Sequence, residues 1–318
     1  MVEDARTGDA ITNFSRRSFV AAGVGLLALG DRAVNAAADD DQGGWIDAHS
    51  HVWTPDTERY PLAAGFRRDE MQPPSFTADE LLALAHPAGV SRVVLIQMSF
   101  YGFDNRYVLD CRRARPQDFS VVAVIDDTAT HAPAELRQLI DGGVRGIRIY
   151  PRNRPVDRWL DGDTMAALWT WGASARVAMC CLVNPGDLPA IDRMCAAHGD
   201  TPVVIDHFAR IGVDGQLRKE HIDQLCRLAR HANTYVKVSA FYALGKKAPP
   251  YTDLAPMIQR LVDAFGPRRL MWGTDCPFQV VSQQYGDSVA LIRERLDFLS
   301  PADRREMLRG TAERVFFA

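Results

Sequence analysis

Eight short apolar segments alternate with eight amphipathic segments between residue 45 and the end of the 318-residue chain. The apolar segments predict buried strands at 46–51, 92–98, 120–125, 145–150, 177–182, 202–207, 234–239 and 269–273. The segments between them predict helices at 78–86, 105–113, 133–140, 163–172, 188–198, 221–231, 254–265 and 287–298. Such alternation indicates parallel β/α units. Eight units within about 250 residues predict a single-domain (β/α)8 TIM barrel rather than an open sheet.

The first 38 residues have a different composition. Arg16 and Arg17 precede a short apolar run at 21–29 and three alanines at 36–38. A basic region, a short apolar region and small residues before a cleavage site are typical of a secretory signal, and the paired arginines resemble a twin-arginine export signal. An N-terminal membrane helix is the alternative, but the run is short and contains glycine. We expect residues 1–38 to be an export signal and residues 39–318 to form the barrel.

We therefore expect the protein to be periplasmic or otherwise exported. Once the signal is removed, we expect no stable insertion into a membrane. The net charge of −3 gives no electrostatic footprint for nucleic acid, so no nucleic-acid partner is expected. The six cysteines have no CxxC pair and no zinc-ribbon spacing, and we expect free, mostly buried thiols. The sequence carries no signal of an oligomeric state.

Ionisable residues at strand ends are the candidates for chemistry, because barrel enzymes place catalytic groups at the carboxyl ends of their strands. His49 and His51 end the first strand, His207 ends the sixth, and Asp275 follows the eighth. Each has a structural alternative, such as a core histidine or a capping aspartate. Their convergence on one barrel mouth favours a catalytic site.

Basic residues extend this predicted site. Ile147 and Ile149 would face the helices, which directs Arg148 into the barrel, and Arg152 follows in the next loop. A buried guanidinium needs an anion from the protein or the substrate. Lys237 is also expected to face inward, where we interpret it as a structural partner of Asp47, a residue that alternation places on the same side as the two histidines of the first strand.

Together these segments resemble the amidohydrolase superfamily (amidohydrolase family 2), in particular its lactonase-like branch with 2-pyrone-4,6-dicarboxylate hydrolase and sugar-lactone hydrolases. The matching stretches are WIDAHSHVW at 45–53, SFYGFDN at 99–105, GVRGIR at 143–148, VIDH at 204–207, GTDCP at 273–277 and GTAER at 310–314. The likeness runs from about residue 45 to the end. None of these motifs identifies the family alone, but all of them together, in this order, do so.

The resemblance implies a role for each matching residue. Asp275 would activate the attacking water, and the three histidines His49, His51 and His207 would polarise the substrate carbonyl. Arg148 would bind a substrate carboxylate or oxyanion. Further substrate contacts are expected from Tyr101, Asn105 and Arg152. The implied reaction is hydrolysis of a lactone, either anionic or derived from a sugar.

The metal requirement separates the alternatives. Metal-dependent relatives carry a further metal-binding group on the fourth or fifth strand, whereas this chain has Arg148 and a histidine-free segment at 177–182. We therefore expect no required cofactor. The alternative is one divalent cation, zinc by preference, held by His49, His51 and Asp275, in a metal-dependent amidohydrolase or an aromatic-acid decarboxylase. A third hypothesis is a non-catalytic exported binding protein on the same barrel.

Overall fold

A computed structural model describes residues 44–129, 131–151, 155–161 and 163–318. The expected export signal at 1–38 and the predicted substrate contact Arg152 lie outside these residues. Within them, no helix is both long and apolar enough to cross a membrane.

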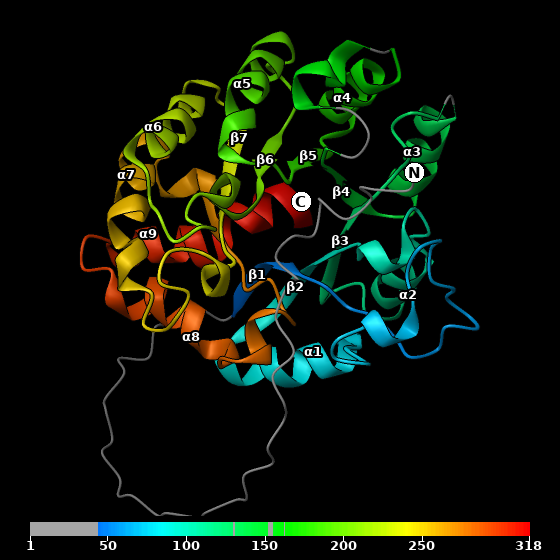
Figure 1. The fold of residues 1–318 in the computed structure, drawn as a ribbon, viewed down its shortest axis with the longest axis horizontal. Coiled ribbons are helices and arrows are strands. Elements are labelled where there is room, and N and C mark those ends of the chain that lie inside the picture. Colours follow the sequence, from blue (N-terminus) through cyan, green and yellow to red (C-terminus); the bar gives the residue numbers. More distant parts are fainter. Residues whose placement is uncertain (1–43, 130, 152–154, 162) are drawn as a thin grey trace, which may run out of the picture.

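Eight parallel strands follow one another around a nearly closed barrel (Figure 1). They are β1 (Trp45–Ser50), β2 (Val90–Ile96), β3 (Phe119–Ala123), β4 (Val144–Ile149), β5 (Ala178–Cys181), β6 (Val203–Ile205), β7 (Thr234–Val238) and β8 (Leu270–Trp272). Each strand pairs with the next in the chain, as expected for β/α units whose crossovers are short and uniform in hand. The predicted (β/α)8 barrel is confirmed.

Helices surround the strands on the outside (Figure 1). They are α1 (Ala78–Ala85), α2 (Arg106–Ala114), α3 (Ala132–Asp141), α4 (Asp163–Ala175), α5 (Leu188–Ala197), α6 (Lys219–Arg227), α7 (Ala255–Phe265), α8 (Tyr285–Ala290) and α9 (Pro301–Arg305). The eight predicted helices are all present. The last of them, expected at 287–298, instead starts at 285 and continues as a π-helical turn to 295.

The C-terminal segment, for which the sequence pattern predicts no helix or strand, closes one end of the barrel. After α9 it forms π-helical turns at Glu306–Gly310 and Glu313–Phe317. Ala312 and Phe316 pack with the side chains that fill the barrel interior: Ile46, Ala48, Val94, Ile96, Val122, Ala178, Cys180, Val204 and Met271. Figure 1 shows this segment in red across the ring of strands. The mouth at the carboxyl ends of the strands stays available for a site.

All six cysteines are free, and four of them are buried. The expectation of free, mostly buried thiols is confirmed. The fold therefore rests on its packed interior and does not depend on disulfides.

Candidate active site

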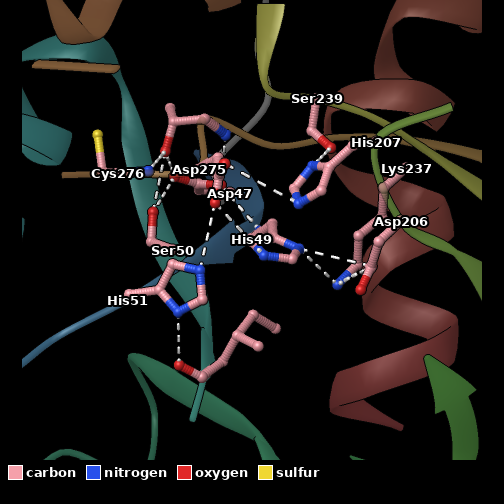
Figure 2. A network of polar contacts seen from close by, with 12 residues as sticks. Asp47, His49, Ser50, His51, Asp206, His207, Lys237, Ser239, Asp275 and Cys276 are labelled. Carbon is pink, nitrogen blue, oxygen red and sulfur yellow. Dashed lines mark hydrogen bonds and ion pairs between the residues drawn. The ribbon is translucent and has the colours of Figure 1, made fainter. Parts of the chain in front are cut away.

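Three strand ends bring three imidazoles and one carboxylate together at the barrel mouth (Figure 2). Asp275 Oδ1 lies 3.6 Å from Nε2 of His49 and 3.2 Å from Nε2 of His51. Its second oxygen, Oδ2, lies 3.9 Å from Nε2 of His207. All four side chains are buried. The structure thus gathers the four residues that the sequence singled out as catalytic.

Closure of the barrel positions Asp275 opposite the histidines of β1. Its backbone N–H donates to the carbonyl oxygen of His49 (2.8 Å), and the N–H of His51 donates to the carbonyl oxygen of Cys276 (2.7 Å). Gly273 permits this close approach, because a Cβ there would lie 2.9 Å from the backbone nitrogen of His49. The motif GTDCP therefore supplies both the glycine that lets its backbone approach that of His49 and the carboxylate of Asp275.

An irregularity in β1 changes which side chains face inward. The register between β1 and β2 shifts between residues 47 and 50. Ala48 packs in the barrel interior, and the adjacent His49 also points inward, where it contacts the buried Lys237. In a regular strand, two adjacent side chains would point to opposite sides. The expectation that Asp47 shares a side with the histidines is wrong, because this shift breaks the alternation. Asp47 instead accepts a hydrogen bond from the hydroxyl of Tyr285 on α8 (2.8 Å).

Lys237 is fully buried on β7, and its partner is Asp206 rather than Asp47. The Lys237 Nζ lies 3.2 Å from Asp206 Oδ1 and 3.1 Å from Nδ1 of His49. Burial opposes ionisation of Asp206, but the charge of Lys237 outweighs it and holds the pKa of Asp206 well below its usual range. The predicted Lys237–Asp47 pair is therefore wrong, since Asp47 lies on the other side of the strand.

Burial and then the charge of Lys237 lower the pKa of His49 well below its usual value. Burial also lowers the pKa of His207 to about 4, although Asp275 acts in the opposite direction. For Asp275, burial opposes ionisation, but His207, His51 and His49 together hold its pKa far below the ordinary range. The site at neutral pH therefore contains an ionised carboxylate beside neutral His49 and His207.

Tyr242 contacts this carboxylate and was missed by the sequence reasoning. Its hydroxyl, buried after β7, donates to Asp275 Oδ2 at 2.8 Å. Burial first, and then the charge of Asp275, raise the pKa of Tyr242 well above its usual value, so the hydroxyl stays a donor. Tyr242 lies in a 3₁₀ turn at Phe241–Ala243, beyond the predicted strand at 234–239, and no recognisable motif marks it in the sequence. Asp206, by contrast, lies in the VIDH motif next to His207, so the sequence does carry a signal for it.

Arg148 points into the barrel, as predicted. It pairs in register with Cys180, a residue of the interior cluster, while the neighbouring Ile147 packs on the outer side. Its charge acts on the ionisation of Asp206 and His207, so the guanidinium lies near the histidine cluster. The mouth therefore contains a buried positive charge beside the reactive groups.

Tyr101 and Asn105 make contacts within the protein. The hydroxyl of Tyr101 accepts from the backbone N–H of Thr54 (3.0 Å). The amide nitrogen of Asn105 donates to the carbonyl oxygens of Phe103 and Val124, and its oxygen accepts from the N–H of Val124. Both side chains are buried and fix the loop after β2. Their assignment to substrate binding stays a prediction.

His49, His51 and Asp275 could hold a metal ion, because each offers a ligand atom and these atoms all lie within 4.8 Å of one another. Two imidazoles and a carboxylate are ligands that zinc accepts. The Nδ1 of His51 lies 3.0 Å from the carbonyl oxygen of Ile96, an outer contact that suits a ligating histidine. His49 differs, because its Nδ1 faces an ammonium donor. The donor types and spacing fit a divalent cation, but the polar atom nearest to Nδ1 of His49 is the Lys237 nitrogen (3.1 Å) and not the carboxylate oxygen of Asp206 (3.5 Å).

Comparisons with known proteins agree with this geometry. The amidohydrolase family model matches residues 46–318. An L-fucono-1,5-lactonase of Burkholderia ambifaria is 29% identical over 84% of this chain and 93% of its own length. A 2-pyrone-4,6-dicarboxylate hydrolase of Comamonas testosteroni is 30% identical over 78% of this chain and 82% of its own length.

A solved amidohydrolase of Burkholderia multivorans with bound zinc superposes with a TM-score of 0.70. It covers 86% of this chain and 99% of its own, and at 23% identity it supports the fold alone. The match of the family model extends over all eight strands, and the motifs at the ends of β1, β6 and β8 carry the residues gathered at the mouth. The chain belongs to the amidohydrolase family.

Proposed function

We propose that this protein hydrolyses a lactone ring and that Asp275 activates the attacking water. The observation that carries the proposal is the single ionised carboxylate facing three imidazole Nε2 atoms at 3.2–3.9 Å. A carboxylate can accept a proton from water, and neighbouring donors can stabilise the oxyanion that forms on the carbonyl. The lactonase and pyrone-dicarboxylate hydrolase among the relatives support a lactone as the substrate.

In the proposed reaction, water adds to the lactone carbonyl as its proton passes to Asp275. His51, whose Nε2 is 3.2 Å from the same carboxylate oxygen, shares that proton. The carbonyl oxygen becomes an oxyanion that accepts hydrogen bonds from His49 and His207. The C–O bond of the ring then breaks, and the leaving alkoxide takes the proton from the Asp275–His51 pair, giving an open-chain hydroxy acid.

The proposed substrate is an anionic or sugar-derived lactone. Arg148, buried near the histidines, supports an anionic group, because a buried guanidinium needs an anion to compensate its desolvation. The relatives act, by their names, on a sugar lactone and on a pyrone dicarboxylate, so the two chemical classes form the first panel to test.

A metal-dependent amidohydrolase or aromatic-acid decarboxylase is the second candidate. One observation favours it: the ligand atoms of His49, His51 and Asp275 all lie within 4.8 Å of one another. The two candidates differ in what a chelator does. A metal-dependent enzyme loses activity when its ion is removed and regains it when zinc is added, whereas the proposed lactonase keeps its rate.

The decisive experiment measures turnover of sugar lactones and aromatic dicarboxylate lactones by the purified protein before and after dialysis against a chelator. We expect turnover that survives the chelator, and metal that is weakly bound or substoichiometric. Loss of the rate with recovery on adding zinc would favour the metal-dependent candidate. Saturable binding without turnover of any lactone would favour a binding protein.

The substitution Asp275→Asn tests the role of the carboxylate. We expect a folded protein with turnover reduced by about 10²–10⁴-fold, the usual contribution of a general base. Asp69→Asn is the matched control, since Asp69 is exposed on the surface and makes its ion pair with Arg67. A folded Asp275→Asn protein with near-normal turnover would show that another group activates the water.

We also propose that residues 1–38 direct export by the twin-arginine route. The support is the pair Arg16 and Arg17 ahead of a short apolar run and small residues. Replacing both arginines by lysine preserves the charge, so loss of export would report recognition of the pair itself. We expect the double variant to accumulate inside the cell with normal activity when purified. Normal delivery of this variant would contradict the proposal.

A further inference from the structure

We propose that Lys237 is a positioning residue that keeps the ring hydrogen of His49 on Nε2. In this form His49 donates a hydrogen bond toward the reacting oxygen and cannot use Nε2 to bind a metal. The inference concerns a buried lysine that the proposed reaction does not use. It rests on the proposed function for the role of His49, but the position of the hydrogen can be measured without any substrate.

The contacts of Lys237 define what its ammonium can do. The side chain has no exposed surface, and its Nζ lies 3.1 Å from Nδ1 of His49 and 3.2 Å from Asp206 Oδ1. Figure 2 shows Lys237 and Asp206 together on the side of His49 that faces away from Asp275. The ring of Phe316 lies 5.3 Å from the same nitrogen, on the barrel floor. An ammonium donates hydrogen bonds and accepts none, so Nδ1 of His49 is the acceptor.

Asp206 would impose the opposite arrangement. Its Oδ1 lies 3.5 Å from the same Nδ1, and a carboxylate only accepts. A neutral imidazole carries one ring hydrogen, so the lysine contact and the aspartate contact require different tautomers. The lysine contact is shorter and comes from a charged donor, while the aspartate is engaged by Lys237 in an ion pair. Lys237 therefore determines the tautomer.

The consequence appears at the other ring nitrogen. Nε2 of His49 is buried and has no hydrogen-bond partner within the part of the chain that the structure describes. It faces Asp275 Oδ1 at 3.6 Å, which is too long for a direct hydrogen bond and leaves the donor for a substrate oxygen. Without Lys237, Asp206 would be the remaining partner of Nδ1. The Nε2 lone pair would then join His51 and Asp275 in a carboxylate–histidine–metal arrangement.

Lys237 thus distinguishes a metal-free site from a metal site built from the same three ligands. The test uses nitrogen-15 NMR of the histidines in the intact protein, with His49 assigned by its loss in His49→Gln. We expect the signature of hydrogen on Nε2. In Lys237→Met we expect zinc affinity, measured by titration calorimetry, to rise at least about 10-fold, the scale on which outer contacts change metal binding. On zinc binding, the His49 signals should change to the form with hydrogen on Nδ1.

Lys237→Arg is the matched control, because guanidinium also donates only and should preserve the tautomer and the weak zinc binding. Hydrogen on Nδ1 in the unsubstituted protein would overturn the proposal, and this result needs no variant to fold. A folded Lys237→Met protein that binds zinc no more tightly than the parent would also overturn it. Absence of lactone turnover would contradict the proposed function and leave the tautomer result intact.

Discussion

Burial acts in opposite directions on Asp275 and His207, which face each other at 3.9 Å. It disfavours the charged form of both, raising the pKa of a carboxyl group and lowering that of an imidazole. For Asp275 the surrounding histidines outweigh burial, whereas for His207 burial outweighs Asp275 and the pKa falls to about 4. The same pocket therefore holds an ionised acceptor beside a neutral imidazole, a pairing suited to activating water and stabilising an oxyanion.

This arrangement predicts a loss of stability on mild acidification. The pKa of His207 falls from 6.5 to about 4 on folding, so the unfolded chain binds more protons between these pH values. Stability is full above pH 6.5 and decreases as the pH falls toward 4, by about 2 kcal/mol from His207 between pH 7 and pH 5. Asp275 has a lowered pKa, so its contribution is lost only at lower pH, below about 4.

Urea unfolding followed by circular dichroism at pH 7 and pH 5 measures this difference. His207→Gln should lower the stability at pH 7 but reduce its change between the two pH values. An unchanged pH dependence in His207→Gln would show that other groups cause it. Substitution of the exposed His131, the residue immediately before α3, is the surface control for the same pair of measurements.

The sequence predicted the residues at strand ends because their position follows from a general property of barrels. His49, His51, His207 and Asp275 all lie where the strand list put them. It did not predict the partner of Lys237, because a one-residue irregularity in β1 moved Asp47 to the outer side. Such irregularities depend on contacts with β8 that are distant in sequence.

At the scale of elements, Asp47 joins β1, the residues after β8, and α8. Its Oδ2 accepts from the hydroxyls of Ser50 (2.7 Å), Thr274 (2.5 Å) and Tyr285 (2.8 Å). Its Oδ1 accepts from the backbone N–H groups of His49 and Thr274, both at 3.0 Å. These hydrogen bonds hold the closing seam of the barrel, directly beneath the catalytic candidates.

Asp47→Asn should therefore destabilise the fold strongly. The amide nitrogen would replace one acceptor oxygen and face donors that lose their partner inside the protein. We expect the free energy of unfolding to fall by about 3 kcal/mol or more, since each unsatisfied buried group costs roughly 1–3 kcal/mol. Tyr285→Phe removes one donor and leaves the acceptor, so we expect a loss of about 1–2 kcal/mol. Equal, small effects in chemical denaturation would contradict this role of Asp47.

Element boundaries were predictable where local signals exist. Thr77 caps α1 by accepting from the N–H of Glu80, and the side chain of Glu80 accepts from the N–H of Thr77. The C-terminal turns at 306–317 were not predicted, because their role is set by the barrel interior that they cover. Phe316 packs there beneath Lys237, a contact between residues far apart in sequence. Local periodicity cannot identify such a plug.

At the scale of the whole molecule, the six cysteine thiols show whether the fold depends on an oxidising or a reducing compartment. Burial raises the pKa of Cys180 to about 12, and those of Cys111 and Cys195 to about 11. The pKa values of the remaining three thiols, those of Cys181, Cys226 and Cys276, are raised as well, again mainly by burial. Because the thiolate is the reactive form, these groups resist oxidation and exchange at neutral pH.

We therefore expect none of the six cysteines to react rapidly with Ellman's reagent in the folded protein at pH 8. All six should react after unfolding in guanidinium chloride without added reductant. A fold that needs no disulfide can be completed in a reducing cytoplasm, which is the condition that the proposed twin-arginine route requires. Fewer than six thiols in the unfolded, unreduced protein would reveal a disulfide and contradict this prediction. A parallel sample unfolded in the presence of reductant, which is removed before the assay, is the control, since it must give six whatever the initial state.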